Sequence, residues 1–198
     1  AIVWTPEEVE LARREMPAEL AAAVCLAYAT AQRQGDLLSL TWTDVTDDGV
    51  IFRPAKAQKR SQQRLLVPIY DELREALALC PRRGVQVLTT AAGQPWNPHT
   101  FRHEFRDACK GAGLRPGLRF HDLRGSALKA FADAGASELE IRAISGHSMR
   151  SLPGALGSYI DAWKSLAVAA VRKRENARRT KVQTEGANHD PVLGLFDT

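Results

Sequence analysis

Residues 120–160 decide how this chain is interpreted, because three short polar motifs follow one another there. The motifs are FHDLRGSAL (120–128), ISGHSM (144–149) and LGSYI (156–160). In chain order they supply His121, Arg124, His147 and Tyr159. Two imidazoles, a guanidinium and a phenol suit the handling of a phosphate group, since a guanidinium pairs with phosphate oxygens and stays charged at any working pH. The pattern of the segment that carries them predicts three helices.

The bulk composition is that of an ordinary globular chain. The 198 residues are 44% apolar and 25% charged with a net charge of +4, so we expect one domain with a sizeable core and a mild basic excess. Three widely spaced cysteines (Cys25, Cys80 and Cys109) favour buried free thiols in a reducing compartment over disulfides or a metal site. There is no apolar run of the roughly 20 residues that a membrane span needs, and no signal peptide opens the chain. We therefore expect a cytoplasmic protein with no membrane partner.

Local sequence signals predict mostly helices. Capping boxes at Thr5–Glu8 and Ser137–Glu140, and an Asn97-Pro98 start, each mark the beginning of a helix. We expect helices over 6–14, 18–31, a short segment with Arg33 and Asp36, 71–79, 98–112, 121–134, 138–145, and 151–174 with a break near Pro153-Gly154.

A small sheet is expected beside these helices. Strands over 50–53 and 64–69, joined by a basic loop, predict a β-hairpin, and 85–90 predicts a third strand. The predicted fold class is α+β, mainly α-helical with a small antiparallel β-sheet.

Each motif carries little information alone. His121 and Arg124 share a helix face at i, i+3, but such a pair is usually an exposed surface pair, and Tyr159 in an amphipathic helix is usually a core residue. The order and spacing of the motifs change this. Together with TAQRQGDLLSLTW (30–42), they resemble the successive boxes of the tyrosine recombinase (phage integrase) family. The resemblance covers residues 1–175 and implies the catalytic-domain fold of that family.

The resemblance implies a role for each matching residue. Arg33 and Arg124 would hold the scissile phosphate, with His121 and His147 as the two site histidines and Tyr159 as the nucleophile. Lys56 would be the lysine of the hairpin, and Asp36 would support the site without contacting the reacting atoms. The residue types agree with these roles. Arginine forks and an imidazole can stabilise the charge that gathers on a phosphoryl group, and a phenol with a pKa near 10 needs nearby cations or a base to attack at pH 7.

Two features depart from the family pattern. Ala57-Gln58 follows Lys56 where the family often has Thr-Gly, and Lys59 is a rival for the catalytic lysine. We favour Lys56 because it directly follows the strand. Ala31 stands where a glycine is usual, two residues before Arg33.

Further basic residues are candidates for DNA contact. Arg102, Arg106 and Lys110 recur at i, i+4, i+8 on one expected helix, and Lys59, Arg60 and Arg64 lie in or beside the hairpin loop. A solvated helix face is an equally good interpretation of the first set. His99 and His103 have helical metal-ligand spacing, yet nothing else in the sequence supports a metal, and we expect neither a metal nor another cofactor.

The C-terminal part carries the densest positive run, from Arg172 to Lys181, followed by an apolar patch over 192–196. A charged helix end, DNA contact and contact with a neighbouring protomer all fit the basic run. We expect residues 176–198 to form a tail that is mobile or docks on a neighbouring subunit.

The predicted function is that of a site-specific DNA recombinase or integrase catalytic domain, which cuts and rejoins DNA through a 3′-phosphotyrosyl intermediate. Its partner is a double-stranded recombination site, which implies a nucleoid-associated location, and there is no small-molecule substrate. We expect a homotetramer on DNA, while the sequence leaves open whether the free protein is a monomer. No N-terminal DNA-binding domain fits before Thr5, so the chain is expected to be a catalytic fragment. The alternatives are a type IB topoisomerase and a non-catalytic DNA-binding protein on the same scaffold.

Overall fold

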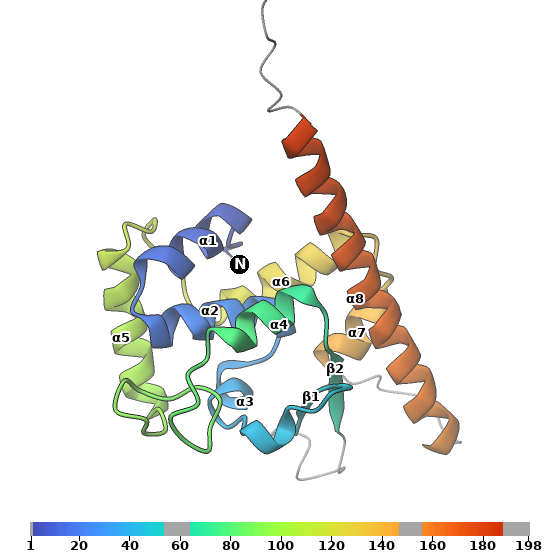
Figure 1. Cartoon of the computed structure of the whole chain (residues 1–198), viewed down its shortest axis with the longest axis horizontal. Coiled ribbons are helices and arrows are strands. Elements are labelled where there is room, and N and C mark those ends of the chain that lie inside the picture. The colour runs from blue at the N-terminus through green and yellow to red at the C-terminus, as the bar shows by residue number, and fades with distance from the viewer. Residues whose placement is uncertain (1, 54–63, 147–155, 188–198) are drawn as a thin grey trace, which may run out of the picture.

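The computed structural model describes residues 2–53, 64–146 and 156–187. Helices make up most of this part of the chain, and the hairpin lies at one end of the body (Figure 1). Within these ranges, no helix is both long enough and apolar enough to cross a membrane.

Two helices open the chain. In α1 (Pro6–Glu15), the Thr5 side chain accepts from the Glu8 amide and the Glu8 side chain accepts from the Thr5 amide, which confirms the predicted capping box. Helix α2 (Ala18–Thr30) is central: it packs on α1, on α4 (Asp71–Ala78) and on α6 (Asp122–Asp133). Almost every residue from Leu20 to Thr30 is buried, and the many alanines allow neighbouring helices to approach from several sides.

The predicted hairpin is confirmed. Strands β1 (Gly49–Phe52) and β2 (Leu65–Pro68) pair antiparallel, with Val50 opposite Val67. The third strand predicted over 85–90 is wrong. Gln86 bridges Thr41 and Thr89 bridges Pro95, so the segment forms single bridges with two different partners. Its β-branched composition favours extended backbone, but no neighbouring strand runs beside it within the described residues.

The remaining predicted helices are present, with ends close to those expected. They are α3 (Gln34–Leu38), α4, α5 (Pro98–Gly111), α6 and α7 (Glu138–Ser145), with a 3-10 turn, η1, at Trp42–Asp44. The expected caps are also present: the Asn97 side chain accepts from His99 N, and the Ser137–Glu140 capping box is complete. Gly146 ends α7 with a φ of 66°, a left-handed conformation that glycine adopts without steric cost.

The last described helix, α8 (Leu156–Ala187), is much longer than predicted. It runs along one side of the body, and its C-terminal turns project past the other helices (Figure 1). The expected end at Arg174 is wrong because no glycine or proline interrupts residues 175–185 and an i,i+4 ion pair, Glu175–Arg179, supports that stretch. The expected break near Pro153-Gly154 lies outside the described residues.

Ala31 has the one positive φ found among the described non-glycine residues. It caps α2 in the left-handed conformation, with φ 56° and ψ 28°, and its side chain is fully buried. This conformation brings the Cβ of an L-residue close to the carbonyl and costs about 1–2 kcal/mol. A glycine would adopt it without that cost, which is a physical reason for the glycine that the family resemblance leads one to expect here.

Substitutions at Ala31 test this strain. In Ala31→Gly, relief of the left-handed cost is offset by loss of a buried methyl, about 0.8 kcal/mol, and by a more flexible unfolded chain. We therefore expect the free energy of unfolding in urea to change by less than about 1 kcal/mol. Ala31→Val should lose about 2–4 kcal/mol, because a β-branched residue fits neither the conformation nor the space. A valine variant as stable as the parent chain would contradict the assignment.

Candidate active site

The first arginine box lies at the junction between α2 and α3. Arg33 is the N-cap of α3, and Asp36 stands in the first turn of that helix. Arg33 Nη1 lies 4.0 Å from Asp36 Oδ2, and the arginine side chain is 41% exposed while the aspartate side chain is 6% exposed. The carboxylate is thus placed under the guanidinium, which remains open to solvent and to a ligand. The supporting role expected for Asp36 stays a prediction.

The second arginine connects two of the predicted boxes through their backbones. Arg124, in α6, donates from Nη1 to Ala31 O at 2.6 Å and from Nη2 to Ser145 O at 2.8 Å. Ala31 lies two residues before Arg33, and Ser145 lies two residues before His147. The guanidinium therefore brings together segments that are about a hundred residues apart in the chain.

A buried glutamine makes a parallel link. Gln32, which is 2% exposed, donates from Nε2 to Thr30 O at 2.9 Å and to Ile144 O at 2.8 Å. It joins the end of α2 to the last turn of α7, beside the link made by Arg124. Sequence reasoning missed Gln32, because a single glutamine between two motif residues gives no local sign of a partner 112 residues away.

The two arginines influence each other electrostatically. Burial and the neighbouring Arg33 charge lower the pKa of Arg124 to about 10, and the Asp36 carboxylate acts in the opposite direction. Arg124 remains charged at pH 7. Two cations placed together at a partly buried position favour an anion between them, because a bound anion offsets their repulsion.

His121 stands at the start of the helix that carries Arg124. It is the N-cap residue of α6, its side chain is 68% exposed, and its Nε2 lies 3.0 Å from Asp122 Oδ1. Asp122 is itself buried, so its carboxylate can orient the ring. Trp4 N donates to Ser126 Oγ at 2.8 Å and fixes this helix to the N-terminal segment.

Several predicted site residues lie outside the described ranges. Lys56, Lys59 and Arg60 fall in 54–63, and His147 immediately follows the end of the second described range. Tyr159 lies in the first turn of α8, where the structure gives the helix but no side-chain description. The expected meeting of six side chains around one phosphate therefore remains a prediction.

The basic residues proposed to face DNA are exposed where the structure describes them. Arg64 precedes β2, and Arg102, Arg106 and Lys110 lie on the outer face of α5. The inner face of that helix is apolar, with Phe101, Phe105 and Cys109 buried. Arg106 also lies 3.5 Å from Asp107, Nε to Oδ1, so part of its charge is balanced locally.

The histidine pair of α5 and the cysteines show no metal-site geometry. His99 and His103 lie with their Nε2 atoms 3.2 Å apart, and the described residues contain no group of three or more potential ligands around one point. Burial raises the pKa of Cys25 and Cys80 to about 12 and that of Cys109 to about 11, which keeps these thiols protonated.

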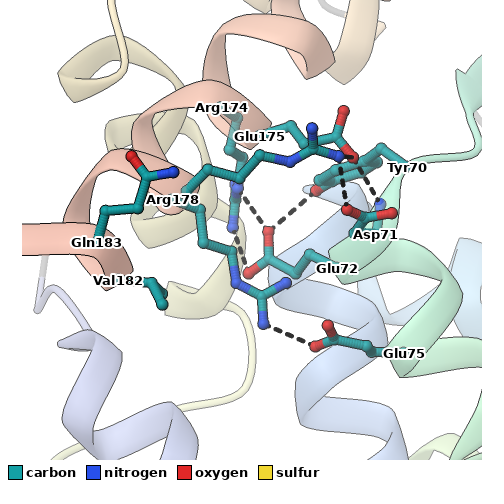
Figure 2. Close-up of a pocket in the computed structure, with 10 residues that line it drawn as sticks. Tyr70, Asp71, Glu72, Glu75, Arg174, Glu175, Arg178, Val182 and Gln183 are labelled. Atoms are coloured by element: carbon teal, nitrogen blue, oxygen red, sulfur yellow. Dashed lines mark hydrogen bonds and ion pairs between the residues drawn. The ribbon is translucent and has the colours of Figure 1, made fainter. Parts of the chain in front are cut away.

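Four residues of the basic run pair within the chain: Lys173, Arg174, Arg178 and Arg179. Figure 2 shows Arg174 and Arg178 of α8 directed at Glu72 and Glu75 of α4. These ion pairs, and that of Lys173 with Glu140 of α7, favour the interpretation of this run as an intramolecular helix contact. Sequence reasoning missed them because they depend on how α4 and α8 pack.

Comparison with known proteins identifies the family. A profile of the phage integrase family matches residues 5–152. The chain belongs to the phage integrase family. The predicted resemblance to tyrosine recombinases is thereby confirmed.

Two curated relatives show the extent of the similarity. A shufflon-specific DNA recombinase of Escherichia coli is 31% identical over 179 residues, which are 87% of this chain and 43% of the relative. The integrase of Mycobacterium phage FRAT1 is 27% identical over 197 residues, covering 88% of this chain and 56% of that protein. The chain thus spans about half the length of these curated relatives.

Solved structures confirm the predicted fold class. The lambda integrase catalytic core superposes with a TM-score of 0.59 at 24% identity, covering 71% of this chain and 90% of that one. The XerA recombinase superposes with a TM-score of 0.60 at 18% identity, covering 90% of this chain and 64% of that one. This phage integrase family member therefore has the fold of a recombinase catalytic core.

The Gln32 link can be tested by removing its donor. Gln32→Met leaves two buried carbonyls without this amide, so we expect the free energy of unfolding in urea to fall by about 2 kcal/mol. Gln34→Met is the matched control, because Gln34 makes a single 3.3 Å bond to Pro98 O in an exposed setting. The control should change stability by less than about 0.5 kcal/mol. Equal effects of the two substitutions would show that the buried link is not special.

Proposed function

We propose that this chain is the catalytic part of a site-specific DNA recombinase, which cuts and rejoins DNA strands through a 3′-phosphotyrosyl intermediate. The observation that carries the proposal is the Arg124 fork, which draws the segment of Arg33 and the segment before His147 to one place. The family membership of the chain supports the same activity. The two arginines would bind the non-bridging oxygens of the scissile phosphate.

The reaction follows from the residue types. The Tyr159 hydroxyl oxygen attacks phosphorus and gives up its proton, with His121 as the acceptor. The bond between phosphorus and the 5′-oxygen breaks, and the leaving oxygen takes a proton from the hairpin lysine, for which we favour Lys56 over Lys59. One phosphodiester is exchanged for another, so a 5′-hydroxyl can reverse the step and rejoin a strand without ATP.

The fixed positive charge of the two arginines would complement the negative charge of the phosphoryl group. Arg33 and Arg124 repel each other in the free chain, and the phosphoryl oxygens, which gain charge in the transition state, would offset that repulsion. His147, which follows Gly146 in the sequence, would add a hydrogen-bond donor. Such a clamp acts by preorganised electrostatics.

DNA is the proposed partner. A lambda integrase tetramer has been solved on a Holliday junction, and the XerH recombinase has been solved bound to its difH substrate. By analogy we propose a double-stranded recombination site, a homotetramer on that site and a monomer when free. Residues beyond α8 would dock on a neighbouring subunit. A cytoplasmic, nucleoid-associated location follows from this partner.

A type IB topoisomerase would use the same chemistry but relax supercoils without exchanging strands between sites. A two-site recombination assay run beside a supercoil relaxation assay separates the two activities. A non-catalytic DNA-binding protein would have no need of the Tyr159 phenol.

Trapping the covalent intermediate tests the chemistry. On a duplex with a nick just 3′ of the scissile phosphate, the short leaving fragment diffuses away, and the parent chain should accumulate a protein–DNA adduct visible on a denaturing gel. Tyr159→Phe removes the attacking oxygen and should abolish the adduct while leaving DNA affinity within about twofold, since a single neutral hydroxyl contributes little to phosphate binding. An adduct that survives this substitution would remove Tyr159 from its role.

The α5 surface, defined as Arg102, Arg106 and Lys110, can be tested by salt dependence. If all three contact phosphates, the triple glutamine variant should bind duplex DNA more weakly and reduce the slope of log affinity against log salt by about 3. The control is Arg13→Gln with Arg14→Gln on α1, where each arginine lies beside a glutamate and the slope should hardly change. An unchanged slope in the α5 variant would assign these residues to a solvated face.

A further inference from the structure

The helix that carries Tyr159 is tied to four other helices by two neighbouring residues, about four turns further along. Helix α8 packs on α7, on α6 and on β2. The residues in question are Lys173 and Arg174, which together contact four helices. Tyr159 and Arg174 are separated by about 22 Å along the axis of one helix, at 1.5 Å per residue.

Arg174 is buried and fully engaged by three helices. Its Nε lies 2.7 Å from Glu72 Oε2 of α4. Its Nη2 donates to Glu72 Oε1 at 3.0 Å and to Tyr28 O of α2 at 3.2 Å, while its Nη1 donates to Ala127 O of α6 at 3.2 Å. The guanidinium also lies over two rings, 4.7 Å from the centroid of Tyr28 and 4.5 Å from that of Phe131. Figure 2 shows the pair with Glu72 inside the groove between α4 and α8.

The geometry of the Arg174 contacts fixes where α8 lies, in addition to attracting it to the other helices. A planar fork that meets one carboxylate and two carbonyls from three directions fits one rotation and one translation of α8, whereas apolar contacts tolerate small shifts along the helix. Burial opposes the charge of Arg174, but Tyr70 and Glu72 raise its pKa above the ordinary value. The group is therefore a permanent cation.

The neighbouring residue fixes α8 to the fourth helix. Lys173 Nζ lies 2.8 Å from Glu140 Oε2 of α7, and that carboxylate is 7% exposed. Burial works against its ionisation, yet the Lys173 ammonium and the hydrogen bonds from Ser137 lower the pKa of Glu140. Glu140 also closes the capping box at the start of α7, so the contact fixes α8 to the helix that ends just before His147.

The four helices contacted here are connected to the site elements. Helix α2 leads into Ala31 and Arg33, α6 carries His121 and Arg124, α7 ends at Ser145, and α4 follows the hairpin. Fixing α8 to α2, α6 and α7 at one level therefore fixes the helix of Tyr159 relative to the backbone carbonyls that hold Arg124.

We propose that Arg174, with Glu72, is a positioning residue for DNA cleavage: the pair sets the register of α8 and thereby the placement of Tyr159 at the phosphate. This inference rests on the proposed function. It assigns Arg174 no contact with DNA or with the reacting atoms. Lys173 and Glu140 support the same register from α7.

The test separates stability from register. Arg174→Met alone leaves Glu72 without its partner in a largely buried place, so the melting temperature should fall by roughly 10 °C. Adding Glu72→Gln removes that charge, and a methionine side chain packs well between two aromatic rings. The double variant should therefore regain most of the lost melting temperature.

The cleavage rate constant of the double variant at saturating nicked DNA should nevertheless remain roughly 10- to 100-fold below the parent, because small misplacements of a reacting group have effects of this size.

A matched pair on the same helix provides the control. Arg178 Nη2 lies 2.7 Å from Glu75 Oε2, one turn further on and far more exposed. Arg178→Met with Glu75→Gln makes the same chemical change. It should leave the melting temperature within a few degrees of the parent and the cleavage rate within about twofold. DNA affinity, measured in parallel at fixed salt, should be unchanged in the Arg174 double variant.

Hydrogen exchange gives a readout that needs no DNA. In the double variant, the amides of residues 160–171 should exchange faster than in the parent, while those of α2 and α6 should not. A double variant that regains both stability and the parent cleavage rate would overturn the proposal and leave Arg174 with a purely structural role. A parent chain that forms no adduct at all would instead overturn the proposed function, and the exchange pattern would still report whether Arg174 sets the register of α8.

Discussion

The organisation of the site depends on one guanidinium, that of Arg124, held between the carbonyls of Ala31 and Ser145. These carbonyls lie at the ends of α2 and α7, where helices leave acceptors without intrahelical partners. A planar cation with several donors can serve two such ends at once. The two bonds orient the fork and hold it against the segment that leads into Arg33 and the segment that ends at Gly146. A lysine could not reproduce this, because an ammonium is a point charge without fixed donor directions.

Much of this arrangement follows from local sequence. The capping boxes at Thr5 and Ser137, the Asn97 cap and the Gly146 end all depend on residues within one turn of a helix, and all are present as predicted. The hairpin was also predictable, since its strands flank turn and loop residues. The arginine pair was expected to share one site because the motif order resembles that of a known family. Arg33 lies near enough to lower the pKa of Arg124, and their shared role at a phosphate stays a prediction.

The parts that escaped prediction depend on contacts between distant segments. Gln32 reaches Ile144, and Arg174 reaches Glu72, Tyr28 and Ala127; neither residue differs locally from an ordinary polar residue in a helix or turn. The wrong third strand has the same origin. The segment 85–90 has strand-like composition, but the backbone groups of Val85 and Val87 bond to Trp42 and Leu40, in an irregular segment. The composition of a segment shows which backbone conformations it tolerates, whereas the neighbouring segment decides whether a regular strand forms.

Arg124 and Arg174 show how one residue type serves two purposes in one fold. Arg174 is enclosed by a carboxylate, two carbonyls and two aromatic rings, and its pKa is raised, so its charge stabilises the folded chain. Arg124 is held by carbonyl dipoles next to a second arginine, and its pKa is lowered to about 10. Its cation is therefore more costly in the free chain and would gain more from an incoming phosphate. A site that binds a transition state benefits from charge that the protein itself leaves incompletely compensated. The same fold supplies the compensation at Arg174, where its effect is to hold a helix in place.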